Sequence, residues 1–134
     1  MTIISSHNDW DQLKEVVVGI ATHARVPTVD KSTHSFCFAD QSYYDIKPLE
    51  GSHADVVIGE ANEDLDNLTN TLVGLGVHVL RPDTIDNSKK FSTPDWETTG
   101  WYQYCPRDLL LPLDNMVIEC PSPMRSRLFE TWSM

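Results

Sequence analysis

Two short apolar runs in the chain predict strands. Residues 13–18 are rich in valine, follow a polar stretch and end at Gly19. A continuous apolar run of this length is typical of a strand that is buried on both faces. A second run, residues 77–80, is stopped by Arg81 and Pro82. We therefore expect a strand at each of these places.

The clearest helical pattern lies between the two predicted strands. Apolar residues recur there at steps of three and four, which is typical of an amphipathic helix with one apolar stripe. Ser52 and Asp55 have the spacing of a capping box at its start, and Gly74 and Gly76 can adopt the left-handed conformation that ends a helix. The stripe consists of Ala54, Val57, Ile58, Ala61, Leu65, Leu68, Leu72 and Leu75.

Two long segments show no regular pattern. Residues 21–51 hold scattered prolines, aromatic and polar side chains, and residues 83–104 form a polar stretch rich in Thr, Asp and aromatic residues. We predict irregular loops for both. A loop of such length in a compact domain usually has a function or packs on a partner.

A β-hairpin is predicted near the end of the chain. Two apolar runs flank Asp114 and Asn115, a pair suited to a two-residue turn. This register places Cys120 opposite Leu109 and so disfavours a disulfide between Cys120 and Cys105.

These elements together predict a mixed α/β fold with a single helix, in one incomplete domain that spans residues 1–134. A single helix covers only one face of a sheet, and the other face would remain apolar. Leu128, Phe129 and Trp132 suggest the first turns of a second helix. Both features indicate an unfinished architecture.

The composition narrows the class of protein. Of 134 residues, 40% are hydrophobic and 22% charged, as in an ordinary globular chain. Ten basic residues against twenty acidic ones give a net charge of −10, the opposite of what a general nucleic-acid binder needs. No apolar run has membrane-spanning length, and no leader pattern precedes residue 10. Three cysteines without a dense framework favour a cytoplasmic protein.

Metal and thiol chemistry find little support in the sequence. His34, Cys37 and Asp40 have ligand types at plausible spacing, but no second cluster accompanies them, so we predict no metal site. Cys37, Cys105 and Cys120 each lack a neighbouring activating pattern, and a structural thiol is the better interpretation of all three.

Asp108 is the most informative polar residue. It enters an apolar run directly after Cys105-Pro106-Arg107, and a charge in such a place costs free energy unless it is paired. One interpretation is a turn cap or a salt bridge to Arg107 or Arg127. The other is a carboxylate that receives a cationic ligand.

Several ordered blocks of the chain resemble the arginine amidinotransferase family. Residues 24–28 with Asp30 are more similar to the inosamine-phosphate amidinotransferases of aminoglycoside biosynthesis than to the glycine-accepting enzymes of creatine synthesis, and enzymes of guanidinium-toxin pathways are also similar. The resemblance spans almost the whole chain but only the N-terminal part of the family's length. The blocks are residues 7–19, Arg81-Pro82-Asp83, residues 93–98, Cys105-Pro106-Arg107-Asp108, residues 118–121 and residues 125–130.

The resemblance implies a fold and a reaction. The fold is a partial five-bladed α/β propeller of the pentein type, built of ββαβ modules, of which this chain would supply about one module and the start of the next. The reaction moves an amidino group from L-arginine to an amine and releases ornithine. Asp108 matches the family's guanidinium-binding aspartate, and a carboxylate can accept two hydrogen bonds from a guanidinium.

The family's nucleophilic cysteine and catalytic histidine belong to motifs that do not occur in these residues. We therefore assign no catalytic residue, and we expect the chain alone to be inactive. The resemblance implies no cofactor, and its partners are small molecules, L-arginine and an amine acceptor, without nucleic acid or membrane; a homodimer is compatible with it. A related hydrolase of the arginine deiminase type and a non-catalytic interaction module remain the alternatives.

Overall fold

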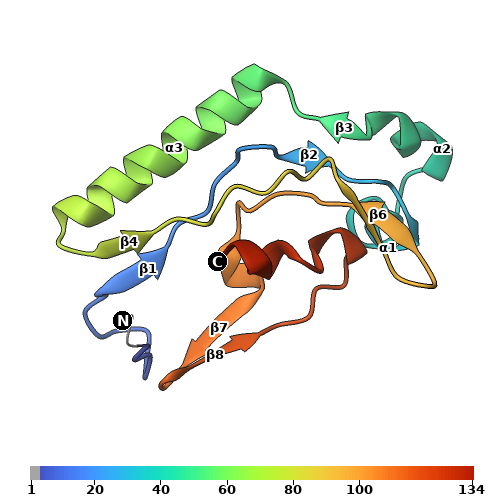
Figure 1. The fold of residues 1–134 in the computed structure, drawn as a ribbon. Helices are drawn as coiled ribbons and strands as arrows, with labels where there is room; N and C mark the ends of the chain where they lie inside the picture. Colours follow the sequence, from blue (N-terminus) through green and yellow to red (C-terminus); the bar gives the residue numbers. More distant parts are fainter. Residues whose placement is uncertain (1–3) are drawn as a thin grey trace.

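The computed structural model describes residues 4–134. The two predicted strands are confirmed: β1 (Glu15–Val17) and β4 (His78–Leu80) pair in parallel, with Val16 opposite Val79. The helix α3 (Asp55–Gly74) connects them and runs beside the pair (Figure 1). The core under this helix consists of Val18, Ala21 and Leu65, with Val16, Ala61, Leu72 and Val79 packed against it.

The helix α3 is confirmed, but its predicted start is wrong. Its N-cap is Ala54, which makes no side-chain cap hydrogen bond, so the capping box does not form. Only part of the apolar stripe is covered, since Leu65 is buried whereas Leu68 and Leu75 are exposed. Gly76, at φ +85°, follows the helix in the left-handed conformation that its sequence predicts.

The prediction of an irregular 21–51 segment, and of a single helix, is wrong. The helices in this segment are too short to show an apolar period, and α1 begins because the Asp30 side chain accepts a hydrogen bond from the backbone N–H of Thr33 at 2.9 Å. The elements are β2 (Arg25–Val26), α1 (Lys31–Cys37), α2 (Tyr43–Ile46), a 3₁₀ turn η1 (Lys47–Leu49) and β3 (Gly51–Ser52), which pairs antiparallel with β2.

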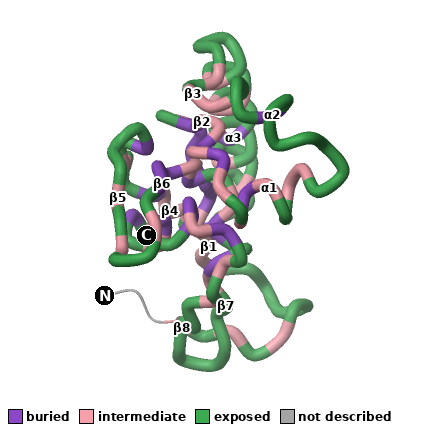
Figure 2. Tube along the Cα trace, turned by 90° about the vertical axis from the view of Figure 1, so that its right-hand side faces the viewer, coloured by how far each residue is buried: buried purple, intermediate pink, exposed green. Residues whose placement is uncertain are grey.

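Two antiparallel hairpins follow β4. The first, β5 (Lys90–Ser92) with β6 (Glu97–Thr99), lies inside the stretch for which only a loop was predicted. The second confirms the predicted hairpin: β7 (Leu110–Leu113) and β8 (Met116–Glu119) meet at the two-residue turn. The Cys120 N–H bonds to the Leu109 carbonyl at 2.7 Å, as the register requires, and all three cysteines are free. Apart from the half-buried Leu110, both strands of this hairpin are exposed (Figure 2).

The C-terminal segment forms 3₁₀ turns rather than the predicted second α-helix. They are η3 (Arg125–Arg127) and η4 (Glu130–Ser133), and a third such turn, η2 (Pro106–Asp108), precedes β7. Each is closed by backbone bonds that span three residues, as from the Leu128 N–H to the Arg125 carbonyl. The turn η3 packs against β6, and the C-terminal turns cross the centre of the view in Figure 1.

A close backbone contact links β1 to the segment that leads into η2. A Cβ on Gly19 would lie 2.1 Å from the Tyr104 carbonyl oxygen, so only glycine fits there. The next residue, Ile20, donates its N–H to the Gln103 carbonyl at 2.9 Å. The segment that follows β1 is therefore held against residues 103 and 104.

The described residues form an α/β fold in which eight short strands pair two by two. The parallel pair with its covering helix agrees with the predicted class. No helix among residues 4–134 has the length and apolarity that a membrane crossing requires.

Candidate functional site

Asp108 is the last residue of η2, where the chain turns into β7. Its N–H bonds to the Cys105 carbonyl at 3.2 Å, and the following residue, Leu109, is buried. The Asp108 side chain is 37% exposed. The carboxylate thus lies at the boundary between the interior and the surface, on a short turn that the buried Leu109 anchors.

The nearest basic group to Asp108 is the buried guanidinium of Arg127, whose Nη1 donates to Oδ2 at 2.9 Å. Arg127 also donates through Nε and Nη2 to the two oxygens of Glu130, at 2.6 and 2.8 Å, and through Nη2 to the Cys105 carbonyl at 3.2 Å. Its guanidinium carbon lies 5.1 Å from the centre of the Tyr102 ring. The sequence interpretation of Asp108 as a partner of Arg127 is confirmed, and the interpretation as a ligand-binding carboxylate remains a prediction.

Burial and charge act against each other in this cluster. Burial raises the pKa of Glu130, which the Arg127 guanidinium opposes. Although burial alone would lower the pKa of Arg127, its bonds to Glu130 and Asp108 raise it. Both Glu130 oxygens accept hydrogen bonds from the Arg127 guanidinium, and this forked pairing is the one that an ionised carboxylate makes with arginine. The cluster therefore holds two carboxylates and one guanidinium, with one negative charge in excess. Burial also raises the pKa of Tyr102 to about 12, so its phenol is neutral.

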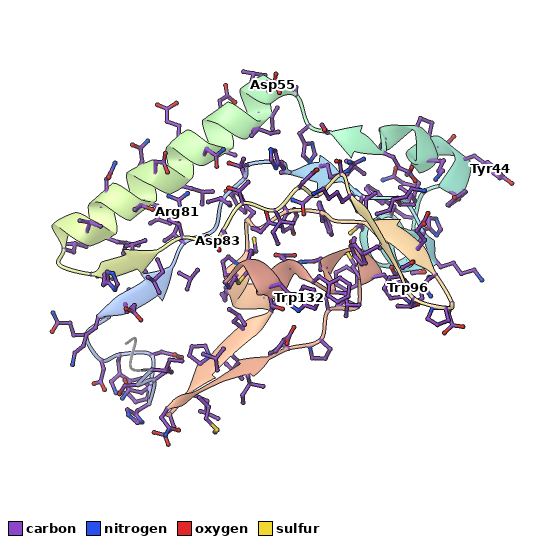
Figure 3. All side chains as sticks on the ribbon, viewed as in Figure 1. Tyr44, Asp55, Arg81, Asp83, Trp96 and Trp132 are labelled. Carbon is purple, nitrogen blue, oxygen red and sulfur yellow. The ribbon has the colours of Figure 1, made fainter. Side chains whose placement is uncertain are left out.

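A second arginine on η3 forms a different ion pair. Arg125 donates through Nη1 to Asp30 Oδ2 at 3.2 Å, and its guanidinium carbon lies 5.4 Å from the centre of the Trp96 ring, which Figure 3 labels. The other Asp30 oxygen accepts from the Ser32 hydroxyl at 2.6 Å and from the Thr33 N–H at 2.9 Å. Burial alone would raise the pKa of Asp30, but these hydrogen bonds lower it overall.

The other sequence candidates do not come together. The His34 ring contacts the Gln41 carbonyl at 2.9 Å, while the Cys37 thiol faces the Met124 sulfur at 3.5 Å. No group of three or more His, Cys, Asp or Glu side chains within residues 4–134 is arranged to hold a metal ion. Burial raises the pKa of the Cys37 and Cys105 thiols, which disfavours the reactive thiolate at both.

A cavity of about 330 Å³ adjoins the Arg127 cluster. Asp108 does not line it, but its sequence neighbour Leu109 and its partner Arg127 do. The remaining lining comes from the end of β8 and the C-terminal turns: Glu119, Cys120, Pro121, Ser122, Leu128 and Thr131.

Sequence reasoning missed Glu130 and Tyr102 as members of the cluster. Arg127 and Glu130 lie three residues apart in a stretch that also holds Leu128, Phe129 and Trp132. Two opposite charges at that spacing among large apolar residues are a signal of a buried ion pair. Nothing in the local sequence indicates that Tyr102 lies beside Arg127.

The chain is similar in sequence to known amidinotransferases. The chain is 44% identical over 131 residues to inosamine-phosphate amidinotransferase 1 of Streptomyces griseus and 37% identical over 129 residues to the mitochondrial glycine amidinotransferase of Xenopus tropicalis. These matches cover 98% and 95% of the chain, but only 38% and 30% of the relatives. No family model matches the chain.

Two solved structures are similar in fold as well as in sequence. An inosamine-phosphate amidinotransferase of Streptomyces griseus superimposes with a TM-score of 0.92 at 42% identity, and an amidinotransferase of saxitoxin biosynthesis from Microseira wollei with 0.80 at 32%. They match 99% and 97% of the chain, which in turn spans 38% and 36% of their lengths.

Proposed function

The chain belongs to the amidinotransferase family, and from this premise we propose that the whole protein transfers an amidino group from L-arginine to an amine and releases ornithine. The observation that carries the proposal is the identity of 43–44% with inosamine-phosphate amidinotransferases over 98% of the chain. An inosamine phosphate or an amine of specialised metabolism is the proposed acceptor, and the cytoplasm the proposed compartment. The proposed whole fold is a five-bladed propeller of pentein type.

Asp108 is the proposed guanidinium-binding residue of this site. Within residues 4–134, its Oδ1 accepts no hydrogen bond, and the Arg107 Nη2 lies 3.8 Å from it on a side chain that is 94% exposed. Such a pair contributes little, so Oδ1 can accept hydrogen bonds from a ligand. A planar guanidinium presents forked N–H donors that suit a carboxylate, and these bonds fix the carbon for attack.

The test is a product assay with L-arginine as donor. The whole protein is incubated with arginine and either an inosamine phosphate or glycine, and ornithine and the guanidinylated amine are measured. We expect both products in equal amounts. Citrulline and ammonia without acceptor would instead identify a hydrolase of the arginine deiminase type, and no arginine consumption would favour an interaction module.

The 134-residue chain alone serves as the second sample. The thiol that would attack the guanidinium carbon is proposed to come from outside these residues, because the motif that carries the family's nucleophilic cysteine does not occur in them. Burial also raises the pKa of Cys37 and Cys105. We expect no ornithine from the chain alone. Turnover by the chain alone would contradict this division of the site.

A further inference from the structure

The Arg127 side chain is fully engaged inside the protein. Its Nε, Nη1 and Nη2 atoms all donate hydrogen bonds, to three different acceptor groups, and the residue is only 5% exposed. The Tyr102 ring lies against the guanidinium. A planar group with this many bonds has one orientation available to it. Arg127 is therefore a fixed point from which Asp108 can be oriented.

Arg127 uses one of the two Asp108 oxygens. The bond from Nη1 goes to Oδ2, and Oδ1 has only the distant and exposed Arg107 beside it. Because Glu130 balances the charge of Arg127, the charge of Asp108 remains available to a cation near the surface. The bond to Oδ2 also limits rotation of the carboxylate about its terminal torsion.

We infer that Arg127 is a positioning residue for arginine binding: it holds Asp108 by Oδ2, so that Oδ1 is presented to the guanidinium of the substrate, and Glu130 fixes Arg127 in turn. This inference rests on the proposed function, because it takes arginine as the ligand of Asp108. It adds an internal guanidinium that acts on substrate affinity without touching the substrate.

The chemistry of the arrangement requires arginine rather than lysine at this position. Asp108, Glu130 and the Cys105 carbonyl lie around one planar group, whose forked donors reach all of them. An ammonium has three donors on a single atom at the end of a flexible stem, and it cannot span these acceptors. Replacement by lysine keeps the charge but releases Asp108.

Arg125 provides a matched control two residues away. It lies on the same 3₁₀ turn and pairs with a single carboxylate, that of Asp30. Both Asp30 oxygens are already bonded within the protein, and its side chain is 14% exposed. Replacement of Arg125 by lysine therefore tests loss of an internal ion pair on η3 without any change at Asp108.

The experiment measures arginine and ornithine binding in the whole protein. Ornithine shares the amino-acid end of arginine but lacks the planar guanidinium. We expect Arg127→Lys to raise the Kd of arginine at least tenfold and to change the Ki of ornithine less than twofold. Arg125→Lys is expected to leave both constants within twofold of the wild type.

A double-mutant cycle tests whether Arg127 acts through Asp108. In the Asp108→Asn background, Arg127→Lys should weaken arginine binding by less than a further twofold, since the group that it orients is already changed. Glu130→Gln, which preserves size and an acceptor oxygen, is the second variant should Arg127→Lys fail to fold. We expect it to raise the Kd of arginine at least threefold relative to the Ki of ornithine.

Two results would overturn the inference while leaving the proposed function intact. One is that the Arg127→Lys protein releases ornithine at the wild-type rate and binds arginine as tightly as the Arg125→Lys protein does. The other is full additivity of Arg127→Lys and Asp108→Asn. By contrast, a wild-type protein that binds arginine but releases no ornithine refutes the proposed transfer, and the variant comparison still tests the positioning role.

Discussion

Arg125 and Arg127 lie two residues apart on one 3₁₀ turn, yet their carboxylate partners Asp30 and Asp108 differ in how many oxygens are already hydrogen-bonded within the protein. Both oxygens of Asp30 are bonded to Ser32, Thr33 and Arg125, so this pair closes a local structure. Asp108 has one oxygen bonded to Arg127 and one near the surface. An ion pair supports ligand binding only where one partner retains unused acceptors, and the comparison shows both situations on a single turn.

The largest expected effect on stability comes from removal of Glu130, the buried partner of Arg127, which has no counterpart beside Arg125. Glu130→Ala leaves the buried Arg127 with fewer charged partners, and breaking a buried ion pair costs about 3–5 kcal/mol. We expect a loss of about 3 kcal/mol in the free energy of unfolding, measured by urea denaturation. Glu63→Ala, on the exposed side of α3, is the control that should change it little. Equal stability of the two variants would mean that the Arg127 cluster does not stabilise the fold.

Asp108→Asn tests whether Asp108 binds the guanidinium of arginine, as proposed. The substitution keeps the shape but removes the charge that would accept guanidinium hydrogen bonds, each of which contributes about 1.5–3 kcal/mol. We expect kcat/KM for arginine to fall by about 10- to 100-fold in the whole protein. Asp95→Asn, an exposed acid between β5 and β6, should leave it unchanged. Unchanged kinetics in Asp108→Asn would make Asp108 a purely structural partner of Arg127.

The pH dependence of stability tests the Asp30 side. The hydrogen bonds of Asp30 lower its pKa below the ordinary value of 3.8, despite burial. A lowered carboxyl pKa adds stability that is fully present above the unfolded-state pKa and is lost as the pH falls through the folded-state pKa. We expect Asp30→Asn, which can still cap α1, to be less stable than the wild type at pH 6, and the difference to shrink towards pH 3. Urea midpoints at the two pH values measure it, and a constant difference would contradict the assignment.

The smallest effect is expected at Arg107, the exposed neighbour of Asp108. Its guanidinium lies 3.8 Å from Oδ1, and the side chain is 94% exposed. Exposed pairs of this kind contribute little because solvent screens them. Arg107→Gln should give no measurable change in melting temperature, in contrast to Arg127→Gln, which removes the buried partner. A loss in Arg107→Gln comparable to that in Arg127→Gln would remove the distinction between the buried and exposed partners of Asp108.

Much of the fold could be predicted where a local pattern is long enough. The apolar period of α3, the valine-rich β1 and the Asp114 turn between β7 and β8 all have the expected place. Short elements escaped prediction. The helix α1 has seven residues, and the charge that caps it is held by Arg125 from 95 positions away in the sequence. The β5–β6 hairpin carries too few apolar residues to indicate strands.

The sequence by itself determined the α/β class, the register of the last hairpin and the family resemblance, including Asp108 as the residue of interest. Only the tertiary structure decided which groups surround that carboxylate. Arg127 reaches it from 19 residues away, and Tyr102, from another part of the chain, lies against the Arg127 guanidinium. Local patterns depend on neighbours along the chain, whereas a buried charge must find its partners in three dimensions, since an unpaired one costs too much free energy.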